Sequence, residues 1–245
     1  RMISPKLRGI EGLAFLSAWL RRGNLQRVLE TNLGDKQGAL DAAVPDGGGM
    51  LRAAPRGVVG HWVAGNVPTL ALFSWALATL GKNSSIVRVS AESVEPVRRL
   101  FAAVSAARYV WRGREFGGEE LLAQTSVVHF PSESRELNTA LSMACDVRAV
   151  WGGSDAVRAV RALDCLEHCE DLVFGPKFSL AVADRQRLAD PVRRRELAHS
   201  LARDVAAFDQ AACSSPQMLF IEGKAAEHGQ WLDELHGALK EQQKR

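Results

Sequence analysis

The sequence contains no hydrophobic run long enough to cross a bilayer. Its longest apolar stretch, Val67–Leu80, is interrupted by Pro68, Thr69 and Ser74, whereas a membrane-spanning helix needs about 20 predominantly apolar residues. The chain also lacks an opening basic segment followed by an apolar one, so we expect no secretion signal. We therefore predict a cytoplasmic protein without a membrane span.

Cysteine is scarce as well. The 245 residues include four cysteines, Cys145, Cys165, Cys169 and Cys213, too few for a disulfide framework at this length, and we expect a reducing compartment. Cys165 and Cys169 have the i,i+4 spacing of half a metal site on a helix, but the sequence has no second ligand pair with suitable spacing. We interpret these two as structural residues and expect no bound metal.

The chain has little excess charge of either sign. Its formal net charge is +3, with 47% hydrophobic and 24% charged residues, close to the averages for a soluble globular protein. Nucleic-acid-binding proteins usually gather their basic residues on one face, and here they are scattered; Arg193–Arg195 is expected to be a solvated helix face. The composition favours small anionic ligands, such as phosphorylated cofactors, over nucleic acid.

What the sequence does contain is an alternation of short β-branched runs with longer helical stretches. The N-terminal segment has helical periodicity at Gly12–Leu20 and Leu25–Leu33, followed by the loop Pro45–Gly49. The predicted strands are Gly57–Val63, Ser85–Val89, Ser126–Phe130, Val147–Trp151, Ser179–Ala183 and Gln217–Glu222. The predicted helices are Pro68–Leu80, Ser93–Ala106, Ser134–Ala144, Ser154–Leu166, Pro191–Phe208 and Gly229–Gln242. Apolar strands separated by helices indicate an α/β protein with a parallel sheet covered on both faces.

Ligands of open parallel sheets bind at the carboxyl ends of the strands, so the strand-to-helix turns are the candidate sites. In the first such turn, Asn66 stands two residues before Pro68, where a helix is expected to begin. Its side chain either caps that helix or donates its amide to a developing oxyanion. The spacing alone favours capping.

Two further turns carry residues suited to a phosphorylated ligand. The sequence Gly152-Gly153-Ser154 offers free backbone N–H groups at the start of a helix, where Gly153 allows a pyrophosphate to approach and Ser154 either caps the helix or binds phosphate. Arg88, at a strand end, could face a phosphate or a ribose, although an isolated arginine there is usually solvated. The G-x-G-x-x-G fingerprint of ordinary Rossmann folds is absent.

Cys213 lies between a predicted helix and a predicted strand, in the run Ala-Ala-Cys-Ser-Ser-Pro, whose small residues leave room for a substrate. A cysteine thiolate is the side chain best suited to accept an acyl group as a thioester. A lone cysteine is more often a small buried hydrophobe. The pattern alone leaves both roles open.

Five of these segments, taken in order, resemble the acyl-CoA reductases of the bacterial-luminescence fatty acid reductase type (the LuxC-like family), within the aldehyde dehydrogenase superfamily. The segments are His61–Pro68, Asn83–Ser90, Trp151–Ser154, Phe174–Lys177 and Asp209–Gln217. The resemblance implies an aldehyde-dehydrogenase-like fold divided into an N-terminal helical segment (1–50), a cofactor-binding α/β domain (51–175) and the beginning of a catalytic domain (176–245). It also implies that the catalytic domain is incomplete and that the chain is truncated relative to the family.

The resemblance also implies roles for individual residues. Cys213 matches the nucleophilic cysteine of the superfamily, and Asn66 matches the asparagine whose amide stabilises the oxyanion. The cofactor-binding residues are expected to be Arg88, Ser90, Glu92, Gly153 and Ser154. Arg88 stands where most relatives place a lysine that contacts the adenosine ribose, and Gly153 and Ser154 match the turn beside the pyrophosphate.

One position departs from the superfamily. Oxidising members carry a water-activating glutamate where this chain has Phe174, and a reductase has no use for that base. The resemblance therefore implies NADPH-dependent reduction of a fatty acyl thioester, carried by CoA or an acyl-carrier protein, to an aldehyde. Glu92 argues for NADH instead.

The alternative is a truncated, inactive nucleotide-binding or partner-docking module of the same fold. The family also suggests a homo-oligomer, or acyltransferase and synthetase subunits as partners.

Overall fold

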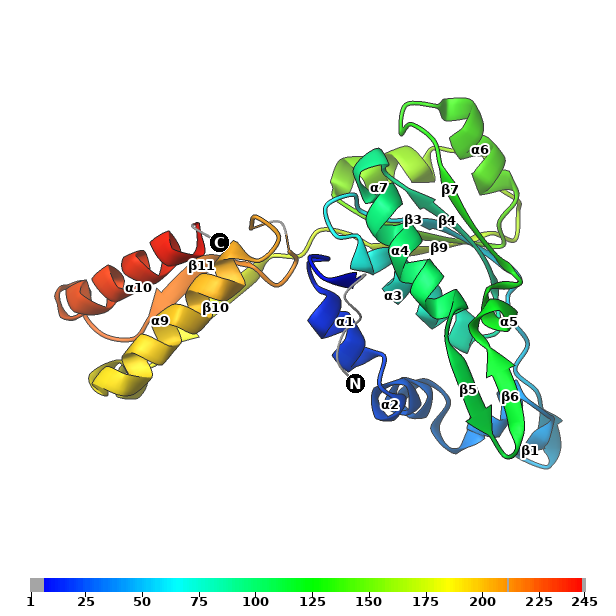
Figure 1. The fold of residues 1–245 in the computed structure, drawn as a ribbon, viewed down its shortest axis with the longest axis horizontal. Helices are drawn as coiled ribbons and strands as arrows, with labels where there is room; N and C mark the ends of the chain where they lie inside the picture. The colour runs from blue at the N-terminus through cyan, green and yellow to red at the C-terminus, as the bar shows by residue number, and fades with distance from the viewer. Residues whose placement is uncertain (1–6, 211, 244–245) are drawn as a thin grey trace. The chain divides into compact units, whose positions relative to one another are not determined.

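The computed structural model describes residues 7–210 and 212–243. The chain divides into two compact units, Arg1–Gly175 and Pro176–Arg245 (Figure 1). The first unit contains a five-stranded sheet and the second a two-stranded sheet with helices. None of the helices in the described part of the chain combines the length and the apolar character that a membrane span requires.

The sheet of the first unit is parallel throughout, with the strand order β7-β4-β3-β8-β9. Its strands are β3 (Val58–Trp62), β4 (Ser84–Val89), β7 (Thr125–His129), β8 (Val147–Trp151) and β9 (Glu170–Phe174). The chain starts in the middle at β3, adds β4 and β7 on one side, then returns to add β8 and β9 on the other. The order therefore reverses between β3 and β8, which is where doubly wound sheets bind ligands. The prediction of an α/β fold is confirmed.

Helices cover both faces of the inner strands. On one face, α1 (Leu13–Trp19), α3 (Thr69–Leu80) and α4 (Val94–Ser105) pack on β4, with Val87, Trp75 and Leu100 in the shared core. On the other face, α6 (Arg135–Met143) and α7 (Ser154–Arg161) cover Trp62 and Val150. The edge strands are less covered, since β9 leaves much of its apolar surface exposed.

Three local features differ from the sequence-based expectations. The expected loop Pro45–Gly49 is the turn of a hairpin between β1 (Val44–Asp46) and β2 (Gly49–Leu51), made possible by positive φ angles at two glycines. A second hairpin, β5 (Arg108–Trp111) with β6 (Arg114–Gly117), was not predicted, because most of its residues are exposed and its polar–apolar pattern resembles a loop.

The third difference concerns the connection from α7 to β9. The predicted helix to Leu166 ends at Arg161, and the edge strand β9 that follows was not predicted. The remaining elements of this unit are α2 (Arg22–Leu33), the 3-10 helices η2 (Gly34–Leu40) and η3 (Ala91–Ser93), and α5 (Gly118–Leu122).

The second unit pairs β10 (Ser179–Ala183) with β11 (Pro216–Ile221) in parallel. The predicted strand Ser179–Ala183 is present, and its partner is the last strand of the chain rather than a strand of the five-stranded sheet. Helices α8 (Arg185–Ala189), α9 (Pro191–Ala206) and α10 (Gly229–Gln242), with the 3-10 helix η4 (Ala225–Glu227), complete the unit. The carboxylate of Asp190 caps α9, which begins with proline.

Candidate functional site

A cavity of about 600 Å³ lies where the strand order reverses in the first unit. The last residues of β3 and β8 form its floor, and α6 and α7 contribute its walls. Its lining includes Trp62, Arg88, Asn138, Gly153 and Ala156. The volume lies in the range of small-molecule sites, which are mostly apolar with a few placed polar groups. The position and the lining both suit a nucleotide.

The start of α7 opens onto this cavity through Gly153. Gly153 is the N-cap residue and makes no side-chain cap, so the first N–H groups of the helix have no capping side chain. A Cβ atom at this position would meet nothing within 4 Å, and its φ of −69° is accessible to any residue. Glycine is thus required neither by packing nor by conformation, and it leaves space for an anion. Ser154 is the first helical residue rather than the cap.

Arg88 is not solvated as an isolated strand-end arginine would be. Its Nη2 donates to the carbonyl oxygen of Phe130 at 2.9 Å, and its guanidinium lies 5.5 Å from the centre of that ring. Burial lowers the pKa of Arg88, while the nearby Glu133 raises it. Its Nε is buried and has no hydrogen-bond partner among the described residues. Arg88 therefore lines the cavity with a guanidinium that Phe130 holds in place.

Ser90 and Glu92 lie close to the first turn rather than in the cavity lining. Ser90 Oγ is within 3.5 Å of Glu92 Oε2, and a Cβ atom at Gly65 would come within 2.7 Å of the same Ser90 Oγ. Ser93 Oγ donates to the Gly65 carbonyl at 2.7 Å. The Ser93 bond joins the turn after β3 to the turn after β4, and Ser90 lies so close to Gly65 that this position has no room for a side chain.

The sequence analysis missed Trp62, Asn138 and the small residues of α7. Trp62 Nε1 donates to Asn138 Oδ1 at 2.9 Å, which fixes the indole in the cavity wall. Ala156 and Ala159 face the cavity from α7. Their three-residue spacing from Gly153 is visible in the sequence and could have predicted a helix face of small side chains.

The two predicted catalytic residues belong to different units. Asn66, in the first unit, is exposed and precedes α3, whose N-cap position is Pro68. Cys213, in the second unit, is an exposed free thiol in the loop before β11. Ser179 Oγ donates to the Cys213 carbonyl oxygen at 2.6 Å, and Ser215 Oγ donates to the Ala207 carbonyl oxygen at 3.3 Å. These two hydroxyl groups anchor the loop.

The other three cysteines have no predicted catalytic role, and two of them are at least partly buried. Cys145 is buried, donates to the Leu141 carbonyl at 2.9 Å, and burial raises its pKa to about 12. Burial also raises the pKa of Cys169. Cys165 is exposed, which makes it the natural control for Cys213. No three His, Cys, Asp or Glu side chains gather as a metal site in residues 7–210 and 212–243.

Phe174 ends β9 and stacks on Trp151, the last residue of β8. The ring centres are 3.7 Å apart and the planes are 6° from parallel, in keeping with the strand register that pairs these residues. The side chain at this position therefore presents an aromatic face and carries no carboxylate.

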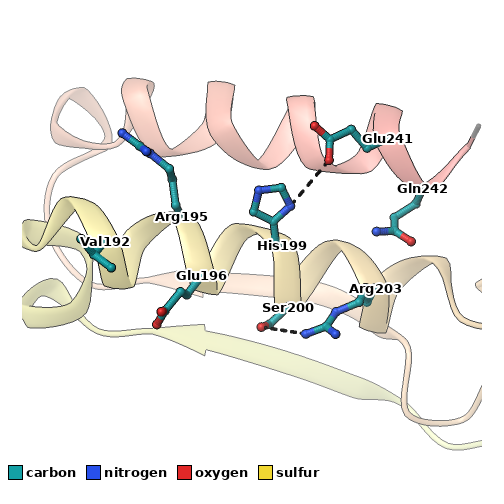
Figure 2. A pocket seen from close by; sticks show the side chains of 8 residues that line it. All are labelled: Val192, Arg195, Glu196, His199, Ser200, Arg203, Glu241 and Gln242. Atoms are coloured by element: carbon teal, nitrogen blue, oxygen red, sulfur yellow. Dashed lines mark hydrogen bonds and ion pairs between the residues drawn. The ribbon is translucent and has the colours of Figure 1, made fainter.

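A second cavity, of about 530 Å³, is an open groove beside α9 and α10 in the second unit. Figure 2 shows His199 of α9 facing Glu241 of α10, 3.8 Å apart, and Arg203 directed at Ser200. Both members of the His199–Glu241 pair are more than half exposed, and an ion pair so exposed contributes little. None of the predicted site residues lines this groove.

Comparison with known proteins extends this description. The sequence profile of the acyl-CoA reductase (LuxC) family matches residues 4–245. The chain belongs to the acyl-CoA reductase (LuxC) family. The resemblance recognised in the sequence is thereby confirmed.

Two relatives in this family are bacterial reductases. The long-chain acyl-protein thioester reductase of Vibrio harveyi is 30% identical over 90% of this chain and 43% of its own length. The long-chain acyl-protein thioester reductase 2 of Photobacterium leiognathi is 29% identical over 81% of this chain and 39% of its own length. The chain thus spans about two fifths of the length of these relatives.

Solved structures confirm the aldehyde-dehydrogenase-like fold. An engineered glycolyl-CoA reductase with bound NADP+ aligns with a TM-score of 0.54, 15% identity, and coverage of 98% of this chain and 55% of its own. The propionaldehyde dehydrogenase of Rhodopseudomonas palustris with bound propionyl-CoA aligns with a TM-score of 0.54 and 16% identity, over 96% of this chain and 52% of its own. A NAD-dependent benzaldehyde dehydrogenase from Corynebacterium glutamicum aligns with a TM-score of 0.56 and 18% identity, over 93% of this chain and 49% of its own.

Proposed function

We propose that this LuxC-family chain takes part in the nicotinamide-dependent reduction of a long-chain acyl thioester to the aldehyde, with the acyl group carried on Cys213. The observation that carries the proposal is the cavity at the strand-order reversal, with the uncapped start of α7 and Arg88 in its lining. The names of the relatives, which act on long-chain acyl proteins, support the choice of substrate.

The residues present fit a nicotinamide dinucleotide. Gly153 and the first N–H groups of α7 would hold the pyrophosphate, and Ala156 and Ala159 leave a shallow apolar wall for the adenine. Arg88 would pair with a 2′-phosphate, which favours NADPH, and a structural neighbour binds NADP+. Glu92 favours NADH, the other nicotinamide cofactor used by such folds. The bound reduced nicotinamide supplies the hydride.

The remaining chemistry belongs to the side chains. The Cys213 thiolate attacks the acyl carbonyl carbon, the carrier thiol leaves, and a thioester to the protein remains. The Asn66 amide donates to the carbonyl oxygen as that oxygen gains charge. Phe174 supplies no carboxylate to activate water, so the acyl group is spared from hydrolysis and remains available for reduction.

The mass of the intact protein tests this proposal. After incubation with a long-chain acyl-CoA, wild type and Cys165→Ala should each gain one acyl group, Cys213→Ala should gain none, and NADPH should discharge the adduct. Cys165→Ala is the matched control because Cys165 is the other exposed free thiol. Acylation that persists in Cys213→Ala would refute the role of that residue.

A second candidate function is a nucleotide-binding or partner-docking module without turnover. It is favoured by the cavity of the first unit, whose lining includes neither Asn66 nor Cys213. Thermal protection by NADPH without any acyl adduct on Cys213 would identify this case, because a ligand that binds only the folded state raises its stability.

A further inference from the structure

Four aromatic side chains from four different elements form an unbroken row in the first unit. Trp19 of α1 lies 4.2 Å from Phe73 of α3, and Phe73 meets Trp151 of β8 edge-on at 5.9 Å, measured between ring centres. Trp151 then stacks on Phe174 of β9 at 3.7 Å. Aromatic rings at these distances, in edge-on or stacked orientations, stabilise one another by more than the burial of their apolar area alone. The row joins α1 to the carboxyl end of the sheet.

The row is partly accessible rather than enclosed in the core. Phe174 is 37% exposed, and Phe15, one helical turn before Trp19 on α1, is 69% exposed. Leu172, two residues before Phe174 and so on the same face of β9, is 49% exposed. Large apolar side chains exposed one beside another are uncommon on a protein surface without a binding role.

The polar atom of the central ring is already satisfied. Trp151 Nε1 donates to Ser74 Oγ of α3 at 2.9 Å. The indole is thereby held in one orientation, and what it offers to a ligand is apolar ring surface. A strip of fixed aromatic faces is suited to a flexible chain of methylene groups, which needs apolar contact and no hydrogen bonds.

The row begins at the candidate site. Trp151 and Phe174 are the last residues of β8 and β9, and Trp151 directly precedes the Gly152–Gly153 turn that lines the nucleotide cavity. From there the row leads through Phe73 to Trp19. An aliphatic chain lying along the rings would therefore have one end beside the proposed cofactor site.

We propose that this aromatic row, Trp19, Phe73, Trp151 and Phe174, together with the exposed Phe15 one helical turn before Trp19, binds the saturated tail of the long-chain acyl substrate and sets the preference for long over short chains. This inference rests on the proposed function for its substrate class. Full burial of one methylene group strengthens binding by roughly fourfold. Contact on one side only should give about twofold per methylene over the length of the row.

Photolabelling tests the location without requiring turnover. The probe is a fatty acid of 14 to 16 carbons with a diazirine at the chain end, used on wild type and on Cys213→Ala. Label should enter the tryptic peptides 9–21, which carries Phe15 and Trp19, and 149–158, which carries Trp151. Excess unlabelled fatty acid should compete. Label confined to other peptides in both proteins would overturn the inference.

Chain-length selectivity tests the function of the row. The initial rates of Cys213 acylation by 14-carbon and 4-carbon acyl-CoA are compared in wild type, in the variant Phe15→Ser/Trp19→Ser, and in Leu121→Ser. Leu121 is the matched control, since it is 56% exposed in the same unit and lies outside the row. The 14-carbon to 4-carbon ratio should fall about tenfold in the double variant and stay at the wild-type value in the control.

Failure of the inference and failure of the proposed function give different results. An unchanged ratio in Phe15→Ser/Trp19→Ser, with Cys213 still acylated, would overturn the role of the row and leave the proposed function standing. Absence of acylation by either chain length in wild type would refute the proposed function. In that case the photolabelling pattern decides by itself whether the row binds an aliphatic chain.

Discussion

His61 should make the first unit lose stability as the pH falls from neutrality toward 4. The side chain lies in the middle of β3, is 1% exposed, and bonds Ser74 Oγ through Nδ1 at 2.7 Å and Ser85 Oγ through Nε2 at 3.2 Å. Burial lowers its pKa from 6.5 to about 4. Since β3 ends at the candidate site, the protonation of this histidine bears directly on the integrity of the cavity.

The magnitude follows from proton linkage. Between pH 6.5 and 4 the unfolded state binds the proton and the folded state does not, so lowering the pH favours unfolding. The stabilisation is therefore present above the unfolded pKa and is lost progressively toward the folded pKa. At pH 4.5 the loss relative to pH 7.5 should be about 2.5 kcal/mol from this residue alone, given about 1.36 kcal/mol per pKa unit.

Urea unfolding followed by tryptophan fluorescence at pH 7.5, 6.5, 5.5 and 4.5 measures this loss. The variant His61→Asn cannot titrate, so its free energy of unfolding should fall about 2.5 kcal/mol less over the same range, whatever its stability at pH 7.5. His236→Asn serves as the control, because it removes an exposed histidine of α10 in the second unit and leaves His61 in place. Equal slopes in wild type and His61→Asn would refute the reasoning.

Three further predictions concern the site, the core and the thiols. Gly153→Asp should fold with a melting temperature near that of wild type, because the position is open. Its affinity for NADPH, measured by thermal protection, should fall by at least about tenfold, because a carboxylate would repel the pyrophosphate. Arg148→Met should lower the free energy of unfolding by about 3–5 kcal/mol in urea melts, because Asp171 would lose its closer partner, at 2.6 Å, in a mostly buried site and keep only the exposed Arg161 at 3.3 Å. Adding Asp171→Leu should restore part of this loss. Iodoacetamide at pH 8 should modify Cys213 and leave Cys145 unmodified until the protein is denatured. The reason is that burial and a pKa of about 12 keep the Cys145 thiolate scarce. Peptide mass spectrometry can follow the modification of each cysteine.

Much of the fold could be predicted because the local signals are strong. The boundaries of β8, β10 and α10 match the expected ranges residue for residue, since β-branched runs and helical periodicity are properties of contiguous sequence. The β5–β6 hairpin escaped prediction because its aromatic residues alternate with arginine and glutamate and are not buried. The pairing of β10 with β11 escaped it because strand pairing is decided by contacts between segments distant in the chain.

The candidate site shows the same division. The turns that carry Asn66, Gly153 and Cys213 were visible as short patterns, and their predicted roles still await the experiments above. The contribution of Trp62 and Asn138 to the cavity was not visible, because their bond spans 76 positions in the sequence.

By itself, the sequence determined the class of fold, the family and the positions of the strand-to-helix turns, because these depend on residue type and on spacing along the chain. Only the tertiary structure decided that Arg88 turns into a cavity, that Gly153 faces open space, and that Trp19, Phe73, Trp151 and Phe174 meet in one row. Burial, cavities and ring contacts arise from side chains that distant elements bring together, and no local pattern specifies them.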